Sequence, residues 1–493
     1  MKAIVRSLGT LCLAGAAVAG CAADPDLGTE TSAAELDSFQ APVAQGVRLR
    51  FVHGSPTSPA VDIYVGAGTS PVFTTVAFGT ATPYVVVPPD GLQLVLRTAG
   101  AAATDAPLYT SEVVAAQTGD TITTIAGGVL GSAMASTRFR VLPYTEAFAA
   151  PERGHAMVRF VHDSYGVAAT SFDVGADGTI EVPGVAAFTA SDAAGIAVAR
   201  PDRDLQLAID TGTPGKRLTT FTLSHEVLEG RGGTFLTVVG VPAFVPSDNR
   251  GLALLAVSRH HATLIRQNPS VFVLPVIPDS TGVDVFAIGR EVPFVQVATN
   301  LGFGALGPAL QVAPTERGIH LVIARSGGSP LAFHATGALV AGERYLAIAS
   351  GFTDGRARVT LTVERDGFDR TLTAGGRLRA VAASPDAPTV DFGQFAPAST
   401  AFTGIAGLAA VAYRQSSAEA GVEVSSAPLN PSVQVTGTTT ALRFRFGALL
   451  PTDRDLGILA GAFAPLASDV PARFVVIKMP VSGAWTATAL SPQ

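Results

Sequence analysis

Hydrophobic and polar side chains alternate along short segments of this chain. Leu49 and Phe51 alternate with Arg48 and Arg50, a period of two that predicts a half-buried β-strand. Residues 61–65, Val-Asp-Ile-Tyr-Val, form the next predicted strand. Long stretches with the 3.6-residue period of a helix are not found, so the pattern predicts an all-β fold.

Turn signals separate the predicted strands. Pro56 and Pro59 lie in a Ser-Pro-x-x-Pro segment, and proline fixes φ and cannot donate a ladder hydrogen bond. Pro89-Asp90-Gly91 is a second turn, placed before the apolar segment 92–96. Short strands with frequent turns indicate immunoglobulin-like β-sandwich modules.

A pattern of about 110 residues recurs along the chain, as expected for tandem modules. Residues 55–62 and 384–391 agree at five of eight positions, in register. Residues 158–162, Val-Arg-Phe-Val-His, match residues 49–53 in the same way. The third copy is recognised by Val-Asp-Val-Phe at residues 283–286.

Two features recur in all four copies, in the same order. The first is an aspartate in the second predicted strand: Asp62, Asp173, Asp284 and Asp391, at spacings of 111, 111 and 107 residues. The second is an apolar strand that ends in glycine: Gly127, Gly240, Gly351 and Gly461. We therefore predict four β-sandwich repeats, at residues 47–150, 151–265, 266–370 and 371–493.

The N-terminus has the order of a secretory signal peptide over residues 1–20. Lys2 and Arg6 give a positive start, and an apolar segment too short to span a membrane follows. Residues 18–21, Val-Ala-Gly-Cys, resemble the bacterial lipobox, in which the cysteine thiol receives diacylglycerol and becomes the new N-terminus. An ordinary signal peptide with a chance cysteine is the alternative.

A lipid on Cys21 would anchor the chain to a membrane, since each buried methylene contributes about 0.8 kcal/mol. Residues 21–46 are rich in Ala, Asp, Glu, Ser and Thr and are expected to form a flexible tether. Asp does not directly follow Cys21, which favours the outer membrane under enteric sorting rules. The expected location is the cell envelope.

Composition limits the alternatives further. The two cysteines are Cys12, in the signal, and Cys21, so the mature chain would have no disulfide. The formal net charge is −6, and loss of Lys2 and Arg6 would make it −8, which argues against a nucleic-acid partner. No second run of 18 uncharged apolar residues is present, so no transmembrane helix is expected.

The first repeat resembles a bacterial and archaeal envelope family called domain of unknown function 4397. The matching residues are Arg50, His53, Ser55, Pro56, Pro59, Val61, Asp62, Tyr64 and Val65. The fourth repeat follows the pattern to Asp391, except for Ala382 in place of histidine, and then departs from it at Gly393 and Gln394. The resemblance implies exported, β-rich tandem modules, and it implies no activity or catalytic residue.

Histidines and aspartates are the first candidates for chemistry. His53 and His162 share one position, which is Pro275 and Ala382 in the other copies, so a hydrogen bond to the adjacent turn is preferred over a metal or catalytic role. The four recurring aspartates are interpreted as solvent-facing or turn-bonding, because calcium would need several clustered oxygens.

Other motifs receive structural interpretations. The segments 202–204 and 453–455, both Asp-Arg-Asp, are interpreted as turns. Residues 302–307, Gly-Phe-Gly-Ala-Leu-Gly, fit a dinucleotide fingerprint but lie in a β module, and residues 260–261, His-His, have no ligand at metal spacing. We predict no catalytic residue, no cofactor and no metal.

Three functions remain open at this point. The first is a non-enzymatic, membrane-anchored array of β modules with a structural, scaffolding or adhesive role, whose partners are envelope polymers or proteins. The second is a glycan-binding module, which clustered exposed aromatic side chains would support; aromatic residues are only 7% of the chain, with a single tryptophan, Trp485. The third is an envelope hydrolase.

Overall fold

The computed structural model describes residues 46–493 as one compact unit. Within that range the described residues exclude 200–203, 212–216, 229–232, 242–250, 260, 291, 396–400, 426–429, 448 and 481–482. The predicted signal peptide, Cys21 and the tether up to residue 45 lie outside the described residues.

The first module is a sandwich of two four-stranded sheets, ordered β4-β1-β7-β8 and β3-β2-β5-β6. Leu49 and Phe51 of β1 pack against Ile63 and Leu96 of the other sheet, so the alternation seen in the sequence does direct one face of β1 into a core. The strands are β1 (Val47–His53), β2 (Val61–Val65), β3 (Phe73–Val76), β4 (Val85–Val87), β5 (Leu94–Thr98), β6 (Tyr109–Thr110), β7 (Thr121–Gly127) and β8 (Arg140–Thr145).

The second module has the same two layers, ordered β11-β10-β14-β15 and β12-β9-β16-β17-β18, with β13 also paired to β9. Its strands are β9 (His155–Ser164), β10 (Ala169–Val174), β11 (Val182–Ala186), β12 (Thr189–Ala190), β13 (Ile196–Ala199), β14 (Leu205–Thr211), β15 (Arg217–Leu223), β16 (Thr234–Gly240), β17 (Ala253–Val257) and β18 (Ala262–Arg266). A short 3-10 helix, η2 (His225–Leu228), follows β15.

The third module returns to two four-stranded sheets, ordered β22-β19-β25-β26 and β21-β20-β23-β24. Its strands are β19 (Ser270–Pro275), β20 (Val283–Ile288), β21 (Val295–Leu301), β22 (Leu310–Gln311), β23 (His320–Arg325), β24 (Pro330–Ala335), β25 (Arg344–Ser350) and β26 (Thr360–Arg365).

The fourth module has sheets ordered β30-β27-β33-β34-β35 and β29-β28-β31-β32. Its strands are β27 (Gly376–Ala382), β28 (Val390–Phe395), β29 (Phe402–Gly404), β30 (Val422–Val424), β31 (Pro431–Val435), β32 (Ala441–Arg443), β33 (Arg454–Ala460), β34 (Arg473–Lys478) and β35 (Thr486–Leu490). The predicted all-β architecture of tandem sandwiches is confirmed.

Each module opens with a strand that lies parallel to a much later one, whereas the neighbouring ladders are antiparallel. The four parallel pairs are β1·β7, β9·β16, β19·β25 and β27·β33. The shared register allows residues of different modules to be equated: His53, His162, Pro275 and Ala382 hold one position, opposite Ala126, Val238, Ala349 and Leu459.

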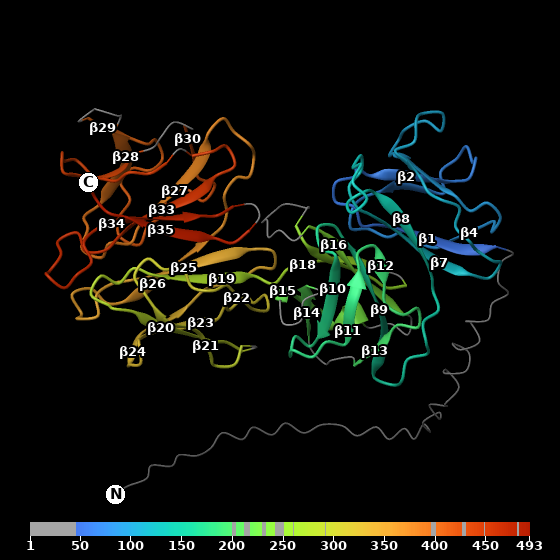
Figure 1. Cartoon of the computed structure of the whole chain (residues 1–493), viewed down its shortest axis with the longest axis horizontal. Helices are drawn as coiled ribbons and strands as arrows, with labels where there is room; N and C mark the ends of the chain where they lie inside the picture. The colour runs from blue at the N-terminus through green and yellow to red at the C-terminus, as the bar shows by residue number, and fades with distance from the viewer. Residues whose placement is uncertain are drawn as a thin grey trace, which may run out of the picture. The chain divides into compact units, whose positions relative to one another are not determined.

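The sheets that carry these parallel pairs are buried on both faces, because the modules associate two by two. The outer faces of β1, β7 and β8 pack on those of β9, β16, β17 and β18, with Val52, Ile125 and Phe235 at the contact. In the same way β19 and β25 pack on β27, β33, β34 and β35 (Figure 1). We call these two contacts the first seam and the second seam. The all-buried patterns of β16, β25 and β33 follow from this packing.

Arginines cross both seams in a reciprocal arrangement. In each pair of modules, an arginine of either module donates to a backbone carbonyl of its partner module. That carbonyl lies at the end of β8, β17, β26 or β34, the strand that comes directly after the parallel pair in the sequence. These bonds are Arg50 to Ser258 O, Arg159 to Thr145 O (3.1 Å), Arg344 to Pro480 O (3.1 Å) and Arg379 to Arg365 O (2.6 Å). Arg50 and Arg379 are each only 2% exposed, so these residues belong to the seam and not to the surface.

Candidate functional site

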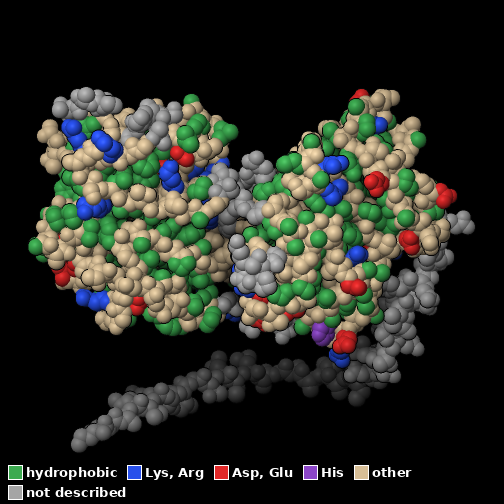
Figure 2. Space-filling view, viewed as in Figure 1, with side chains coloured by type: hydrophobic (Ala, Val, Ile, Leu, Met, Phe, Trp, Pro, Cys, Tyr) green, Lys and Arg blue, Asp and Glu red, His purple; other side chains and the backbone are tan. Residues whose placement is uncertain are grey.

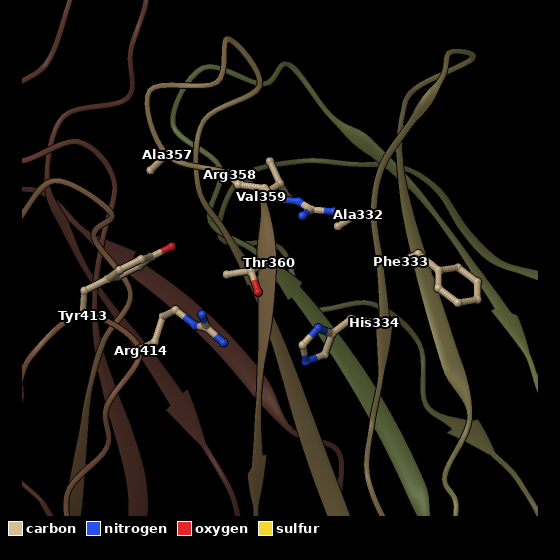
Figure 3. A pocket seen from close by; sticks show the side chains of 9 residues that line it. All are labelled: Ala332, Phe333, His334, Ala357, Arg358, Val359, Thr360, Tyr413 and Arg414. Atoms are coloured by element: carbon tan, nitrogen blue, oxygen red, sulfur yellow. The ribbon is translucent and has the colours of Figure 1, made fainter.

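A pocket of about 540 Å³ opens beside the second seam, between the third and fourth modules (Figure 3). The third module contributes Ala332 and His334 of β24 and residues 358–360 at the start of β26. The fourth module contributes Tyr413 and Arg414, from the connection between β29 and β30. We call this the seam pocket.

The lining of the seam pocket carries positive charge and no carboxylate. Arg358 of the third module and Arg414 of the fourth module both line the pocket, and in the view of Figure 3 Thr360 lies between them and His334 to one side. Burial, with a smaller effect from Arg414, lowers the pKa of His334 below its ordinary 6.5, so its imidazole is neutral near pH 7. The arrangement offers two permanent cations beside neutral hydrogen-bonding groups, which fits an anion.

Tyr413 adds a fixed hydroxyl to this wall. Its phenol oxygen lies 3.0 Å from Ser350 Oγ of β25, a hydrogen bond that joins the two modules. Burial raises the pKa of Tyr413 above its ordinary value of 10.0, so the phenol stays protonated. The seam pocket is therefore anchored to the second seam and not to a free loop.

Arg414 is held in a left-handed backbone conformation, with φ of 68°. Its amide donates to Ala382 O at 2.7 Å, and the other modules repeat this bond at Gly79, Phe188 and Gly304. All four residues have positive φ. This backbone conformation is strained for any residue that has a side chain, whereas glycine adopts it without strain. At this position only the second and fourth modules have side chains, which here are phenylalanine and arginine.

The seam pocket exists because the third module ends its sheet at β26. In the second and fourth modules an additional strand, β18 or β35, covers the matching side of the seam: Gly79 faces Leu264 of β18, and Gly304 faces Ala489 of β35. The first and third modules lack that strand among their described residues. The first seam fills the space with Phe188, whose ring lies 3.9 Å from the Arg140 guanidinium, and the second seam leaves it open.

Smaller side chains deepen the seam pocket from below. In the first module Tyr109 and Phe139 pack edge to face, with ring centroids 5.0 Å apart. Cross-strand register puts Ala332 and Val359 at the equivalent positions of the third module. Because the register is not visible in the diverged sequence of the third repeat, sequence reasoning missed this pocket.

Exposed aromatic rings gather on the outer face of β20, β23 and β24. Phe286 stacks on Phe294 at 5.1 Å, and His320 stacks on Phe333 at 4.6 Å. Phe286, Val322 and Phe333 are direct neighbours across the three strands. Phe294 is 63% and Phe333 62% exposed. We call this group of four rings the aromatic face.

The two recurring histidines lie fully buried at the ends of β1 and β9. His53 Nε2 contacts Pro59 O at 3.0 Å, and His162 Nε2 contacts Val167 O at 3.1 Å, so both bind the following turn, in agreement with the preferred interpretation. Burial lowers the pKa of His162 to about 4, which keeps it neutral. Among the described residues, no group of three His, Cys, Asp or Glu side chains could hold a metal ion.

Three of the four recurring aspartates hold a strained turn. Asp62 accepts from Thr75 N at 2.7 Å, Asp284 from Asn300 N at 2.8 Å, and Asp391 from Ala410 N at 2.7 Å. The donor residues have φ of 52°, 47° and 53°. Each carboxylate thus fixes a residue in the left-handed conformation, which agrees with the turn-bonding interpretation.

The second module departs from the predicted aspartate position. Cross-strand register makes Ser171, and not Asp173, the equivalent of Asp62. Val61 pairs with Thr98 in the first module as Thr170 pairs with Thr211 in the second, and the next residues along these strands are Asp62 and Ser171. Ser171 Oγ accepts from Gly184 N, whose φ is 61°, and so takes over the carboxylate's role. Asp173 lies two residues further on and bonds Asp177 N, Gly178 N and Arg217. The sequence comparison chose Asp173 because it lies between apolar residues as Asp62 does, and this aspartate is two residues away from the equivalent position.

The glycine position needs a smaller correction. In the first module the residue equivalent to Gly240, Gly351 and Gly461 is Gly128, not Gly127, because β1 pairs His53 with Ala126. All four have positive φ. A Cβ at Gly128 would lie 2.5 Å from Arg138 O, so the site requires glycine for space as well as for conformation.

The described residues of the remaining sequence motifs are not among those that line the seam pocket. Residues 302–307 follow β21 and are not followed by a helix, which excludes the dinucleotide arrangement in this segment. The segment 453–455 was interpreted as a turn, but Arg454 and Asp455 are the first two residues of β33, and the Arg454 guanidinium donates to Asp369 O. Asp202, Arg203 and His260 lie outside the described residues.

A buried carboxyl at the first seam escaped sequence reasoning. Asp163 is 1% exposed and neither of its oxygens has a hydrogen-bond partner among the described residues. Burial raises its pKa well above 3.8, although Arg140 opposes the shift. The equivalent residues are Gly54, Val276 and Ala383, so a carboxyl is not required by the fold.

On the face shown in Figure 2, charged side chains are scattered singly or in small groups among hydrophobic and uncharged ones. Within the described part of the chain, no helix has the length and apolar character needed to cross a membrane.

Comparison with known proteins places the chain in a family. The family described as "Domain of unknown function (DUF4397)" matches residues 47–174 and 269–393, two tandem stretches that together make up about half of the chain. Each stretch takes in one whole module and the first two strands of the next. A search of curated proteins finds no match. This chain, with two tandem copies, belongs to the DUF4397 family.

Proposed function

We propose that this protein is an exported lipoprotein of the cell envelope, anchored through lipid on Cys21, whose four β modules have a structural, scaffolding or adhesive role. The proposed role is non-enzymatic, and the proposed partners are envelope polymers or proteins and not nucleic acid. The observation that carries the proposal is the burial of both faces of the parallel-pair sheets. Modules joined in this way form stiff two-sandwich bodies, which suit the display of surfaces at a fixed spacing.

The anchoring part of the proposal rests on the sequence of residues 1–21. The order of charge, apolar segment and Val-Ala-Gly-Cys suits export and lipid attachment. Residues 21–46 would then separate the lipid from the first module. The compact unit begins at Gly46, and in this proposal the lipid anchors the chain while the modules fold without it.

The experiment is Cys21→Ser, with Cys12→Ser as the matched control within the signal. We expect Cys21→Ser to leave the membrane fraction and Cys12→Ser to remain there, with circular dichroism and thermal unfolding unchanged in both. Retention of Cys21→Ser in the membrane, or loss of its fold, would contradict the proposal. Mass spectrometry of the N-terminal peptide identifies the lipid directly.

Glycan binding is the second candidate function, and the aromatic face favours it. Large exposed rings on one flat sheet face can stack on the apolar C–H surface of a sugar, and such patches commonly mark interaction sites. If the parent chain binds a glycan on an array, we expect Phe294→Ala to remove that binding, because it deletes an exposed ring of the aromatic face that does not line the seam pocket. Met134→Ala, which removes an equally exposed apolar side chain in the first module, is the control. A parent chain that binds no glycan on the array would remove this candidate.

A further inference from the structure

The seam pocket contains two guanidinium groups that the described structure leaves without a carboxylate partner. Other arginines near the second seam are paired: Arg344 with Asp366 at 2.6 Å, Arg365 with Glu419 at 2.6 Å, and Arg356 with Asp469 at 2.8 Å. Arg358 and Arg414 have no ion pair in the described structure and instead line the same cavity. Two arginines that line one cavity without a carboxylate among the described residues provide the usual setting for an oxyanion.

The size and the neutral groups of the seam pocket indicate more than a bare ion. A volume near 540 Å³ lies within the range of about 300–1,000 Å³ that is typical of small-molecule sites. Thr360, His334 and Tyr413 add neutral hydrogen-bonding atoms beside the two arginines. These groups suit hydroxyls on the body that carries the oxyanion.

The first seam supplies an internal comparison. Its equivalent space is occupied by Phe188, stacked under Arg140, and its floor by Tyr109 and Phe139. Two positions with glycine, Gly79 and Gly304, show that the backbone at Arg414 needs no arginine. The guanidinium of Arg414 is therefore carried at a conformational cost that the fold does not require, as is common at binding sites.

We propose that the seam pocket binds an acidic sugar unit, with Arg358 and Arg414 pairing its carboxylate or phosphate oxygens and Thr360, His334 and Tyr413 bonding its hydroxyls. This inference deepens the glycan-binding function proposed above and assigns it an acidic envelope polymer as substrate class. The two sites share Phe333 of β24, whereas Phe286, Phe294 and His320 of the aromatic face do not line the seam pocket. Variants at these three rings therefore distinguish the two sites.

The pH dependence of binding follows from His334. The other titratable groups in the lining are Arg358, Arg414 and Tyr413, and burial raises the pKa of Tyr413 so that its phenol stays protonated. An oxyanion between the arginines would offset the repulsion by Arg414 and raise the pKa of His334, so binding is coupled to proton uptake. Affinity should then increase as the pH falls from 8 towards 5, and His334→Gln should flatten this dependence.

The test is calorimetric titration of the purified full chain with glucuronate, glucose 6-phosphate, glucose and inorganic phosphate. We expect both acidic sugars to bind and glucose not to bind, and a preference between the two acidic sugars identifies the oxyanion. Arg414→Gly, which installs the residue found at positions 79 and 304, should weaken binding at least about tenfold without lowering the melting temperature. Ala332→Tyr should block the pocket with the side chain that the first module has there.

The controls separate this proposal from the others. Arg138→Gln removes the equivalent exposed arginine of the first module and should change nothing. Cys21→Ser tests the anchor, and Phe294→Ala tests the aromatic face at a ring that does not line the seam pocket. Both variants should leave the affinity for acidic sugars unchanged. Equal affinity for glucose and glucuronate, phosphate binding as tight as that of the acidic sugars, unchanged affinity in Arg414→Gly, or no binding of either acidic sugar would each overturn the proposal.

Discussion

At the scale of single residues, the seams contain polar side chains that have hydrogen-bond partners and one buried carboxyl group that has none among the described residues. The guanidinium groups of Arg159 and Arg344 reach backbone carbonyls of the opposite module, at 3.1 Å in both cases. Asp163 lies at the first seam too, with no hydrogen-bond partner among the described residues. A Cβ at Gly127 would overlap its carboxyl group, so Asp163 fits only because the facing residue is glycine.

Asp163 should make the first seam less stable as the pH rises. Its folded-state pKa lies above the ordinary 3.8, so the folded chain binds this proton more tightly than the unfolded chain does. The free energy of unfolding is therefore highest below the unfolded-state pKa of Asp163, near 3.8, and it decreases as the pH rises towards the folded-state pKa. We expect Asp163→Ala, the residue found at position 383, to raise the free energy of unfolding by about 1–3 kcal/mol at pH 8 and by less at pH 4.

Thermal unfolding of the parent chain and Asp163→Ala at pH 4, 6 and 8 provides the measurement. Asp163→Asn is the matched control, because it keeps the shape and removes the titration, so its difference from the parent should also grow with pH. A parent chain that is stabilised relative to both variants as the pH rises would show that the carboxylate is paired.

At the scale of elements, the sequence predicted strands, turns and recurring positions, because these depend on neighbouring residues. The period of two at Leu49 and Phe51 identified β1, and the Ser-Pro-x-x-Pro turn identified its end. Equivalence between modules depends on pairing across the sheet, which the sequence does not display. Asp173 was therefore equated with Asp62 in place of Ser171, and Gly127 with Gly240 in place of Gly128.

The site was harder to predict than the strands. Arg358 and Arg414 are 56 positions apart in the sequence, and they line the same pocket only because β27 packs beside β25. Nothing in the sequence around Arg414 indicates its left-handed backbone, since glycine holds that position in only two of the four modules. The seam pocket also depends on the third module's lack, among its described residues, of a strand equivalent to β18 or β35. The absence of a strand produces no sequence motif that could have predicted the pocket.

The seam arginines should contribute far more to stability than exposed ion pairs do. Arg344 and Asp366 are 3% and 0% exposed, and Arg344 also lies 5.0 Å from the Trp485 ring. Arg344→Ala would leave a buried carboxylate with only Arg370, and we expect a loss of about 3–5 kcal/mol in the free energy of unfolding.

Arg365→Ala is the matched control for this prediction, measured by the same urea unfolding. Arg365 and Glu419 also join the third and fourth modules, but they are 46% and 41% exposed. Such a pair is worth at most about 1 kcal/mol. Similar losses in the two variants would mean that the second seam is open to water.

At the scale of the whole molecule, the unit of organisation is a pair of modules. The family matches begin at residues 47 and 269, 222 residues apart, and so recur once for every two sandwiches. The hydrophobic clusters agree, since one joins the first two modules and another joins the last two. A lone first module would expose Val52 and Ile125 and leave Arg50 without its carbonyl in the second.

If a pair of modules is the folding unit, one module cannot fold stably without its neighbour. The measurement is denaturant unfolding of residues 46–150 and residues 46–268, each compared with the full chain. We predict that residues 46–268 unfold cooperatively with native circular dichroism, and that residues 46–150 aggregate or lose several kcal/mol of stability because the seam face is exposed. A fragment 46–150 that is monomeric and as stable as 46–268 would contradict the paired-module account.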